Sequence, residues 1–394
     1  MKIVVTLKLL LSRLFRIMTH FPARYYASVM PRCLFIVFGI VIFQYDSQAQ
    51  QNHSRPEFYD VNEYHLVTKF DTHVHIYTDD ESLIRQAEED NFRLVDINGY
   101  LFPGAPPVEE QQSLAVNHVR NFNNKVDYVT TISVKNFNED SWQQETIRYL
   151  KNSFAQGAVG VKVWKNIGME LRDVNGKLVM INDPKFDPVL DFIAKEGITL
   201  FSHQGEPKDC WLPLDEMILN RGYYSRNPQY HMYAHPDYPS YEDQIYARDH
   251  MVQKHPDLKI ISVHLASLEW SVDEIAKRLD KFPNMAVDIA ARISSLQYQA
   301  VTDRQKVYDF FVKYQDRILY GSDMTITNAK DDPASVRKNA NDRWFRDWKF
   351  FVSDEINRSS QFAGEYKGLK LPREVVDKIY YRNAVTWIPH ILRK

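Results

Sequence analysis

The sequence contains only two cysteines among its 394 residues, and it carries no excess of positive charge. Lys and Arg number 49 against 51 Asp and Glu, which gives a formal net charge of −2. Proteins that bind nucleic acid need a basic footprint to neutralise phosphates, so we expect no nucleic-acid partner. Low-complexity tracts, internal repeats and Gly/Ser linkers are also missing after residue 50. Nothing in the sequence therefore indicates a repeat array or a flexible string of domains.

Long hydrophobic runs are scarce as well. The clearest is the segment 34–43, LFIVFGIVIF, which is about half of the roughly 20 apolar residues that a membrane-spanning helix needs. Ser47 and Ala49 follow it at the −3 and −1 positions of a signal-peptidase site. We therefore expect residues 1–49 to be a secretory signal peptide, with Met30 as an alternative true start. A membrane-anchored N-terminus is the other interpretation of this segment.

Cleavage after residue 49 would change both the charge and the cysteine count. It would remove six basic residues and one Asp, which leaves 43 basic and 50 acidic residues and a formal charge of −7. Cys33 would be lost with the signal peptide, and Cys210 alone could not form an intrachain disulfide. We expect an exported protein, periplasmic or extracellular, without a stable membrane anchor after cleavage. Its stability would then depend on its core, for which 44% hydrophobic residues provide the material.

From residue 67 onward, strand-like and helix-like segments alternate, as they do in proteins built from βα units around a parallel sheet. Eight such pairs are sufficient to close a (β/α)8 TIM barrel, and a single barrel with insertions commonly fills a chain of this length. We therefore predict a single barrel domain of α/β class over residues 50–394. The expected strands are 69–75, 92–97, 127–134, 159–164, 199–203, 259–264, 285–289 and 318–321, and the expected helices are 81–90, 108–122, 142–154, 186–196, 241–255, 272–282, 303–314 and 373–387.

Two connections are longer than the others and are rich in aromatic residues. The first, residues 209–246, follows the fifth expected strand and contains six Tyr and one Trp before Tyr246. The second, residues 325–365, follows the eighth strand and contains Trp344, Trp348 and four Phe. Long loops at the ends of barrel strands are more often functional than idle, although aromatic stripes also serve simple packing. We expect both insertions to cover the mouth of the barrel.

Several of the expected strands end in a side chain that can bind a divalent metal or move a proton. The C-terminal ends of all strands of a (β/α)8 barrel meet on one face, so these side chains should converge there. His73 and His75 are two residues apart on one strand, which directs both imidazoles to the same side. Histidines and a carboxylate together suit Zn²⁺ or another borderline divalent ion. The side chains at the strand ends are His73, His75, Lys162, His203, His264 and Asp323.

These segments together resemble the amidohydrolase superfamily of barrel enzymes. The resemblance covers residues 71–383 and rests on FDTHVH, GVKVW, FSHQGEP, SVHLAS, YGSD and YRNAV. The last segment looks like the closing helix of the branch that contains small metal-dependent hydrolases and non-oxidative decarboxylases. The resemblance implies a divalent metal cofactor, most simply one Zn ion. By this resemblance the metal ligands would be His73, His75, His203 and Asp323.

The resemblance also implies catalytic roles. Asp323 would bind the metal and shuttle a proton from the nucleophile to the leaving group. His264 would either bind a second metal or stabilise oxyanion charge on the substrate. Lys162 has three interpretations: a carboxylated bridge between two metals, a substrate-facing amine beside one metal, or a structural lysine. A buried amine needs an anionic neighbour in each of them.

Three further residues are candidates for binding substrate. Glu206 lies three residues after His203, Arg292 lies just beyond the seventh expected strand, and Trp164 follows Lys162 closely. The forked guanidinium of Arg292 suits a carboxylate. The alternative for Glu206 and Arg292 is a surface salt bridge on a loop, and the alternative for Trp164 is a cap over the pocket.

The resulting hypothesis is an exported metal-dependent hydrolase in which a metal-activated water attacks an ester, lactone or amide bond of a small molecule. A non-oxidative decarboxylase or a hydratase on the same barrel is the first alternative, because fold alone does not determine chemistry. A non-catalytic barrel that binds a ligand through its aromatic loops is the alternative of another class. The sequence leaves open whether the chain forms a homo-oligomer.

Overall fold

Nine short parallel strands form one curled sheet in the computed structural model, which describes residues 56–99, 106–327 and 332–391. The predicted signal peptide lies outside the described residues. The order of the strands follows the chain from β8 back to β1, with β9 next to β1. The strands are β1 (Lys69–Ile76), β2 (Phe92–Ile97), β3 (Val126–Thr131), β4 (Ala158–Val163), β5 (Thr199–Ser202), β6 (Ile260–Ser262), β7 (Met285–Asp288), β8 (Ile318–Leu319) and β9 (Met324–Ile326).

The predicted eighth strand is split into β8 and β9. β8 pairs with β7 and β9 pairs with β1, so the segment between them connects the two edges of the sheet. Within that segment Tyr320 O accepts a hydrogen bond from Thr72 N at 3.0 Å, and Asp323 N donates to His73 O at 2.7 Å. The sheet therefore has the curled parallel arrangement of a TIM-like barrel.

The strands are buried on both faces, which explains their continuous apolar sequences. All eight residues of β1 and all six of β4 are buried. Phe70, Val95, Val129 and Phe201 come from four different strands and pack together inside the curled sheet. Gly160 allows this packing, because a Cβ there would lie 2.7 Å from the Phe201 ring.

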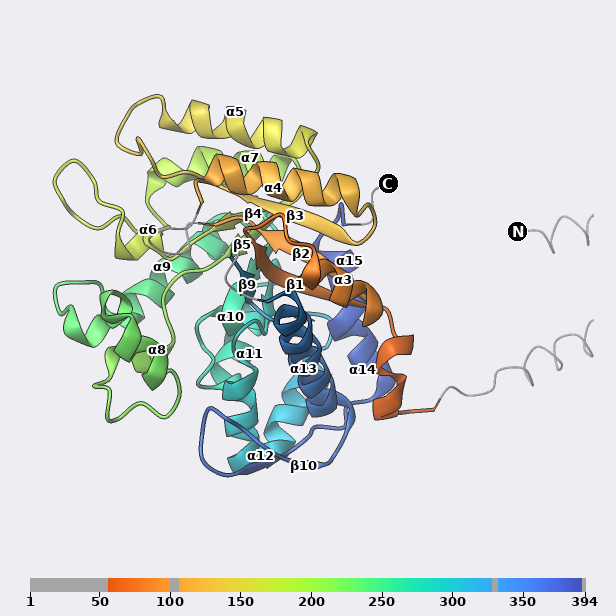
Figure 1. Ribbon diagram of the computed structural model, residues 1–394. Coiled ribbons are helices and arrows are strands. Elements are labelled where there is room, and N and C mark those ends of the chain that lie inside the picture. The colour runs from red at the N-terminus through yellow and green to blue at the C-terminus, as the bar shows by residue number, and fades with distance from the viewer. Residues whose placement is uncertain (1–55, 100–105, 328–331, 392–394) are drawn as a thin grey trace, which may run out of the picture. The chain divides into compact units, whose positions relative to one another are not determined.

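Helices surround the sheet, with α4, α5 and α7 on one side and α11, α12 and α13 on the opposite side in Figure 1. Six of the eight predicted helices lie within one residue of the observed bounds. The helices are α3 (Ser82–Glu89), α4 (Val108–Asn121), α5 (Trp142–Ala155), α6 (Asn166–Met169), α7 (Asp187–Lys195), α8 (Arg221–Arg226), α9 (Tyr241–Lys254), α10 (Val263–Ala266), α11 (Val272–Lys281), α12 (Ile293–Lys313), α13 (Pro333–Val352), α14 (Arg373–Asp377) and α15 (Asn383–Trp387).

Two helix predictions need correction. The predicted helix 303–314 is only the second part of α12, which begins at Ile293 and has a non-helical residue, Asp303, where its two parts meet. The predicted closing helix 373–387 consists of α14, a π-helical turn (Lys378–Arg382) and α15. Periodicity alone does not reveal such interruptions, because the apolar residues on either side keep nearly helical spacing.

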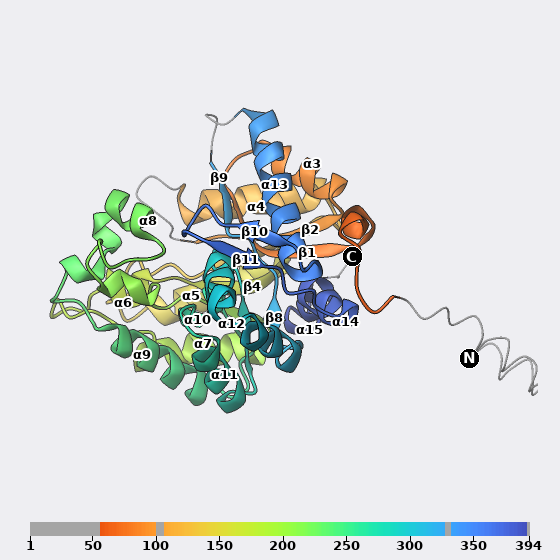
Figure 2. The same ribbon diagram turned by 90° about the horizontal axis from the view of Figure 1, so that it is seen from below.

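The second insertion is not an aromatic cover over the site. About half of it is α13, which begins at Pro333 with the Asp332 side chain accepting a hydrogen bond from Ser335 N. Trp344 and Trp348 are fully buried in the core. A short hairpin of β10 (Ile356–Arg358) and β11 (Glu365–Lys367) follows α13, and Figure 2 shows this hairpin beside α12 and α13.

The first insertion is built mainly from short helical turns. Its buried members, which include Cys210, Tyr224, Tyr230 and Met232, pack with Trp164 at the end of β4. The described residues from 58 onward belong to one compact unit. In the described part of the chain, no helix combines the length and the apolar character that crossing a membrane requires.

Candidate functional site

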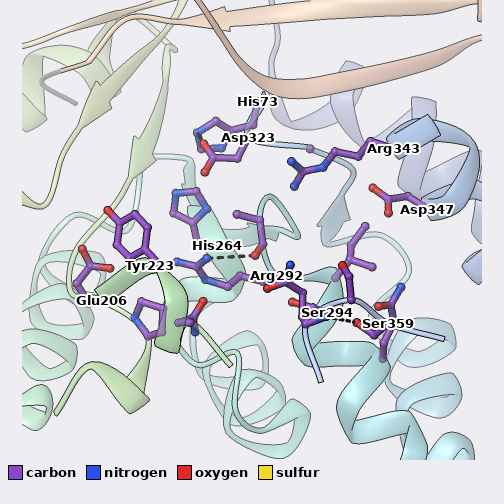
Figure 3. A pocket seen from close by; sticks show the side chains of 18 of the residues that line it. His73, Glu206, Tyr223, His264, Arg292, Ser294, Asp323, Arg343, Asp347 and Ser359 are labelled. Atoms are coloured by element: carbon purple, nitrogen blue, oxygen red, sulfur yellow. Dashed lines mark hydrogen bonds and ion pairs between the residues drawn. The ribbon is translucent and has the colours of Figure 1, made fainter. Parts of the chain in front are cut away.

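One cavity of about 500 Å³ opens at the C-terminal ends of the strands, and every site residue that the sequence predicts lines it. Figure 3 shows His73, Asp323 and His264 close together, with Arg292 and Glu206 on the wall below them. Residues from the ends of six different strands are therefore brought to one face. The predicted residues in the cavity wall are His73, His75, Lys162, Trp164, His203, Glu206, His264, Arg292 and Asp323.

The two histidines of β1 are each held through Nδ1. His73 Nδ1 lies 2.7 Å from Asp288 Oδ2, and His75 Nδ1 lies 2.6 Å from Ile97 O. Both partners are acceptors, so Nδ1 carries a hydrogen, and in the neutral imidazole Nε2 then keeps its lone pair. The two Nε2 atoms lie 3.4 and 3.3 Å from Asp323 Oδ1. Metal-binding histidines are oriented in the same way by an acceptor on the second nitrogen.

His264 stands on a left-handed helical turn. His264, Leu265, Ala266 and Ser267 have φ values of 59°, 55°, 58° and 51°, a conformation that costs roughly 1–2 kcal/mol per non-glycine residue. The Asp288 carboxylate accepts a hydrogen bond from His264 N at 2.6 Å. Such strain persists only where surrounding contacts hold it, and it clusters at functional sites.

The imidazole of His264 is held through Nδ1, as are those of the two histidines of β1. Its Nδ1 lies 2.9 Å from Ala290 O, a pure acceptor, so its Nε2 also presents a lone pair. The ring of His203 lies 4.4 Å from that of His264, measured between centroids. His203 Nε2 is buried and has no hydrogen-bond partner among the described residues. A buried nitrogen without a partner is costly unless a ligand satisfies it.

These donors fit a divalent metal. His73, His264 and Asp323 each offer one ligand atom, and these atoms lie within 4.8 Å of one another. The tightest group thus contains His264, which the sequence hypothesis gave an alternative role. His75, through its contact with Asp323, and His203, through its contact with His264, lie next to this group. Imidazole nitrogens with a carboxylate oxygen are the ligands that Zn²⁺ and similar ions take.

The protonation states also favour a metal. Burial holds the pKa of His73, His203 and His264 well below the usual range of histidine. Burial alone would raise the pKa of Asp323, whereas positive charge on the imidazoles of His264, His75 and His73 lowers that pKa well below the ordinary value. Neutral imidazoles and an ionised carboxylate are the forms that bind a metal.

Lys162 lies at the centre of this cluster. Its Nζ is 3.3 Å from His73 Nε2, and the side chain is buried. Burial lowers the pKa of the Lys162 amine to about 8, with Asp288 and Asp323 acting in the opposite direction. The anionic neighbours that a buried lysine requires are therefore present. The side chain faces the cavity, as both functional interpretations of Lys162 require.

Glu206 forms a buried ion pair, not the surface salt bridge considered as its alternative. Its partner is Lys165, and Tyr224 OH donates to Glu206 Oε2 at 3.0 Å. Lys165 also lies over the Tyr230 ring, 3.9 Å from its centroid. Because the charge of Glu206 is already matched, it offers little attraction to a cationic substrate. Lys165, which the sequence offered only as a residue that lines or caps the pocket, is the basic member of this pair.

The sequence argument missed two residues of this region. Asp288 holds both His73 and His264, and its signal was a carboxylate at the end of the buried strand β7. Arg343 lines the cavity from α13, in the segment that was expected to act through aromatic residues. No local pattern marks Arg343, because its position depends on how α13 packs.

Comparison with known proteins gives a family but no near relative. A family model described as amidohydrolase matches residues 137–389. No curated protein matches the sequence. Among solved structures, 2,6-dihydroxybenzoate decarboxylase from Rhizobium is 13% identical, with a TM-score of 0.47 over 82% of this chain and 98% of that chain.

Two other solved structures illustrate the range of these matches. 5-Carboxyvanillate decarboxylase from Novosphingobium aromaticivorans is 11% identical, with a TM-score of 0.45 over 85% of this chain and 100% of that chain. Dihydroorotase from Campylobacter jejuni is also 11% identical, with a TM-score of 0.39 over 77% of this chain and 93% of that chain. At these levels of similarity the reaction has to be argued from the site itself.

Proposed function

Because this chain belongs to the amidohydrolase family, we propose that it is a metal-dependent hydrolase that cleaves an ester, lactone or amide bond of a small molecule. The observation that carries the proposal is the convergence of imidazole Nε2 lone pairs on one ionised carboxylate, Asp323. Each of three imidazoles is fixed through Nδ1, so the lone pairs are directed before any ligand arrives. A non-catalytic binding barrel would not require this arrangement.

We assign the cofactor site to His73, His75, His203 and Asp323, with His264 as a further ligand. One divalent ion, most simply Zn, would bind there, and a second would require a carboxylated Lys162. When bound, such an ion supplies Lewis-acid chemistry: it acidifies water and polarises a carbonyl group. We propose that the fold is a (β/α)8 barrel and that its insertions after the fifth and eighth strands form walls around this metal site.

The residues of the chain supply the proton transfers. Asp323 is ionised, so it can accept a proton from the attacking water and return it to the leaving group. Neutral His264 presents a lone pair to the cavity, which suits a ligand or a proton acceptor. Its donation of a hydrogen bond to an oxyanion would require the protonated form. The mostly buried walls limit the access of bulk water to the reacting groups.

The test combines metal content with a substrate screen. The purified protein is expected to contain Zn, Mn or Fe in near-stoichiometric amount and to lose it on His73→Ala. The metal-loaded protein is then screened against esters, lactones, amides and aromatic acids, with Asp323→Asn as the blank. Turnover by Asp323→Asn at the parent rate would contradict the proton-shuttle assignment. Release of CO2 from an aromatic acid, with no hydrolysis, would replace the hydrolase with a decarboxylase.

We further propose that the chain is exported, to the periplasm or beyond the cell. The support is the apolar run 34–43 followed by the small residues Ser47 and Ala49. N-terminal sequencing of the protein from a secreting host is expected to begin at Gln50. A chain that keeps residues 1–49 would contradict the proposal.

A further inference from the structure

The cavity wall has a strong excess of positive charge. Six basic side chains and three acidic ones line it, whereas the whole chain carries a formal charge of −2. A cleft of one sign of charge concentrates ligands of the opposite sign, and a divalent metal would add to the effect. The basic residues are Lys162, Lys165, Arg292, Arg343, Arg346 and Arg358.

Most of these charges already have partners. Lys165 pairs with Glu206, Lys162 contacts His73, and Arg358 pairs with Glu365 across the hairpin at 2.9 Å. The remaining acids are also engaged. Asp347 accepts a hydrogen bond from Tyr320 OH at 3.0 Å and lies 3.8 Å from Arg346. Burial raises the pKa of Asp347, and the charges of Arg343 and Arg346 act in the opposite direction.

Arg343 differs from the other cations. Among the residues that the structure describes, no hydrogen bond and no ion pair within 4 Å joins its guanidinium to another side chain, and its charge acts on Asp347 from a greater distance. Its side chain extends from α13 into the cavity, toward the side where His73 and Asp323 lie (Figure 3). Arg292 lies nearer His264, donates to Ala291 O at 3.1 Å, and has a buried Nε without a partner among the described residues. Two guanidinium groups with unused donors thus face one cavity.

We infer that Arg343 and Arg292 bind a carboxylate group of the substrate that is separate from the bond to be cleaved. The inference rests on the proposed hydrolase function and specifies its substrate as an anionic small molecule. A guanidinium fork matches the two oxygens of a carboxylate, which is why arginine is preferred where such a group must be oriented. Glu206 does not oppose such a substrate, because Lys165 balances its charge.

The first experiment measures binding without the metal, so that it does not depend on catalysis. Glutarate, a dianion, and glutaramide, its neutral analogue, are titrated into metal-free protein by calorimetry. The parent is expected to bind glutarate and not glutaramide. Arg343→Gln is expected to weaken glutarate binding about 10- to 100-fold, the range for losing a hydrogen bond to a charged group. Arg343→Lys, which keeps the charge but loses the fork, is expected to retain part of the affinity.

The matched control is Arg337→Gln. Arg337 lies on the same helix but pairs with Glu89 and Gln86 on α3, outside the cavity. The Arg337→Gln variant should bind glutarate with the affinity of the parent. Equal affinity of the parent and Arg343→Gln for glutarate, or equal binding of glutarate and glutaramide by the parent, would overturn the inference.

A second experiment separates this inference from the proposed function. Monomethyl glutarate carries a free carboxylate next to its ester, and dimethyl glutarate does not. Arg343→Gln is expected to raise KM for the monoester about 10-fold or more and to leave KM for the diester unchanged. Hydrolysis of the monoester with the same KM in the parent and in Arg343→Gln would refute the inference but not the proposed hydrolase function. Glutarate binding that depends on Arg343, without hydrolysis of either ester, would support the inference about Arg343 and contradict the proposed hydrolase function.

Discussion

At the residue scale, Asp288 is the side chain that connects the two halves of the site. One of its oxygens accepts the Nδ1 hydrogen of His73, and the other accepts the backbone N–H of His264. The same carboxylate therefore fixes the tautomer of one candidate ligand and the strained backbone of another. Burial raises the pKa of Asp288, while the neighbouring His264 and Lys162 lower it.

Asp288→Asn is expected to weaken metal binding about 10- to 100-fold while leaving the fold intact, as is typical when an outer partner of a ligand is changed. An amide has only one acceptor oxygen. If that oxygen serves His264 N, the NH2 group faces His73 Nδ1 and favours the tautomer whose Nε2 is blocked by hydrogen. The measurement is a competition titration against a chromophoric chelator.

The control for this change is Asp280→Asn, on the exposed surface of α11, which should leave metal affinity unchanged. Equal affinities of the parent and Asp288→Asn would show that Asp288 does not set the tautomer of His73.

The identity of the site residues was largely predictable, but their orientation was not. His73, His203, His264 and Asp323 each stand where an apolar run ends, and strand ends converge in a barrel. The acceptors that fix their Nδ1 atoms come from other strands or loops, such as Ile97 and Ala290. A pattern along one segment contains no information about such partners.

At the element scale, the turn α10 is the most unusual feature. Four consecutive non-glycine residues hold the left-handed conformation, and their backbone groups are tied down by contacts from other elements. Tyr241 OH donates to Ser267 O at 2.6 Å, and Ser267 Oγ donates to Gln204 O at 2.9 Å. The strain is therefore maintained by tertiary contacts and places His264 toward the cavity.

Ala266→Gly and Ala247→Gly form a matched pair that measures this strain. Both alanines are 2% exposed, and both changes remove one methyl group and add the same freedom to the unfolded chain. Ala247 lies in the right-handed helix α9, where glycine costs about 1 kcal/mol. At Ala266, glycine also relieves a strain of about 1–2 kcal/mol. In urea unfolding, we expect Ala266→Gly to lose about 1–2 kcal/mol less unfolding free energy than Ala247→Gly. Equal losses of unfolding free energy would show that the turn is not strained.

Elements with strong local signals were predicted well, and those shaped by packing were not. β2 (Phe92–Ile97) agrees with its predicted bounds, because a buried strand flanked by polar residues is distinctive. α13 was overlooked although Asp332 and Pro333 form a typical helix start, since its aromatic residues suggested a loop over the site. Trp344 instead donates from Nε1 to Asp71 Oδ2 at 2.8 Å inside the core.

At the scale of the whole molecule, pH should act on stability through a group remote from the site. Asp127 lies near the start of β3, at the opposite end of the sheet from the cavity. Burial raises its pKa to about 7, although Arg93 works against this. The unfolded value is about 3.9, so the folded state holds the proton more tightly. The stability from this group is fully present below pH 4 and is lost as pH rises through 7.

Asp127→Asn should remove this dependence. From pH 5 to pH 8 the parent is expected to lose about 1–3 kcal/mol of unfolding free energy relative to the variant. Urea unfolding of both proteins at the two pH values provides the measurement, and all other titrating groups cancel in the comparison. Asp257→Asn, an exposed aspartate, should follow the parent. If the unfolding free energies of the parent and of Asp127→Asn changed equally between pH 5 and pH 8, Asp127 would not have a raised pKa in the folded state.

Metal binding should couple the site to the stability of the whole barrel. The candidate ligands come from β1, β5, the turn after β6 and the segment between β8 and β9. An ion that joins them connects segments about 250 residues apart in the chain, and the unfolded chain has no such site. Metal at a thousandfold excess over its Kd should therefore stabilise the folded state by about 4 kcal/mol.

The prediction is checked by thermal unfolding with and without a chelator. Removing metal should lower the Tm of the parent, and His73→Ala should lose most of that shift because it removes a ligand that Asp288 has already oriented. His231→Ala alters a buried histidine of the first insertion that hydrogen-bonds Leu212 O at 2.8 Å and does not itself line the cavity. It should unfold at a lower temperature yet keep the full metal-dependent shift. If His73→Ala kept the shift as well, the metal would bind elsewhere, and the imidazole cluster would be a buried polar network without a cofactor.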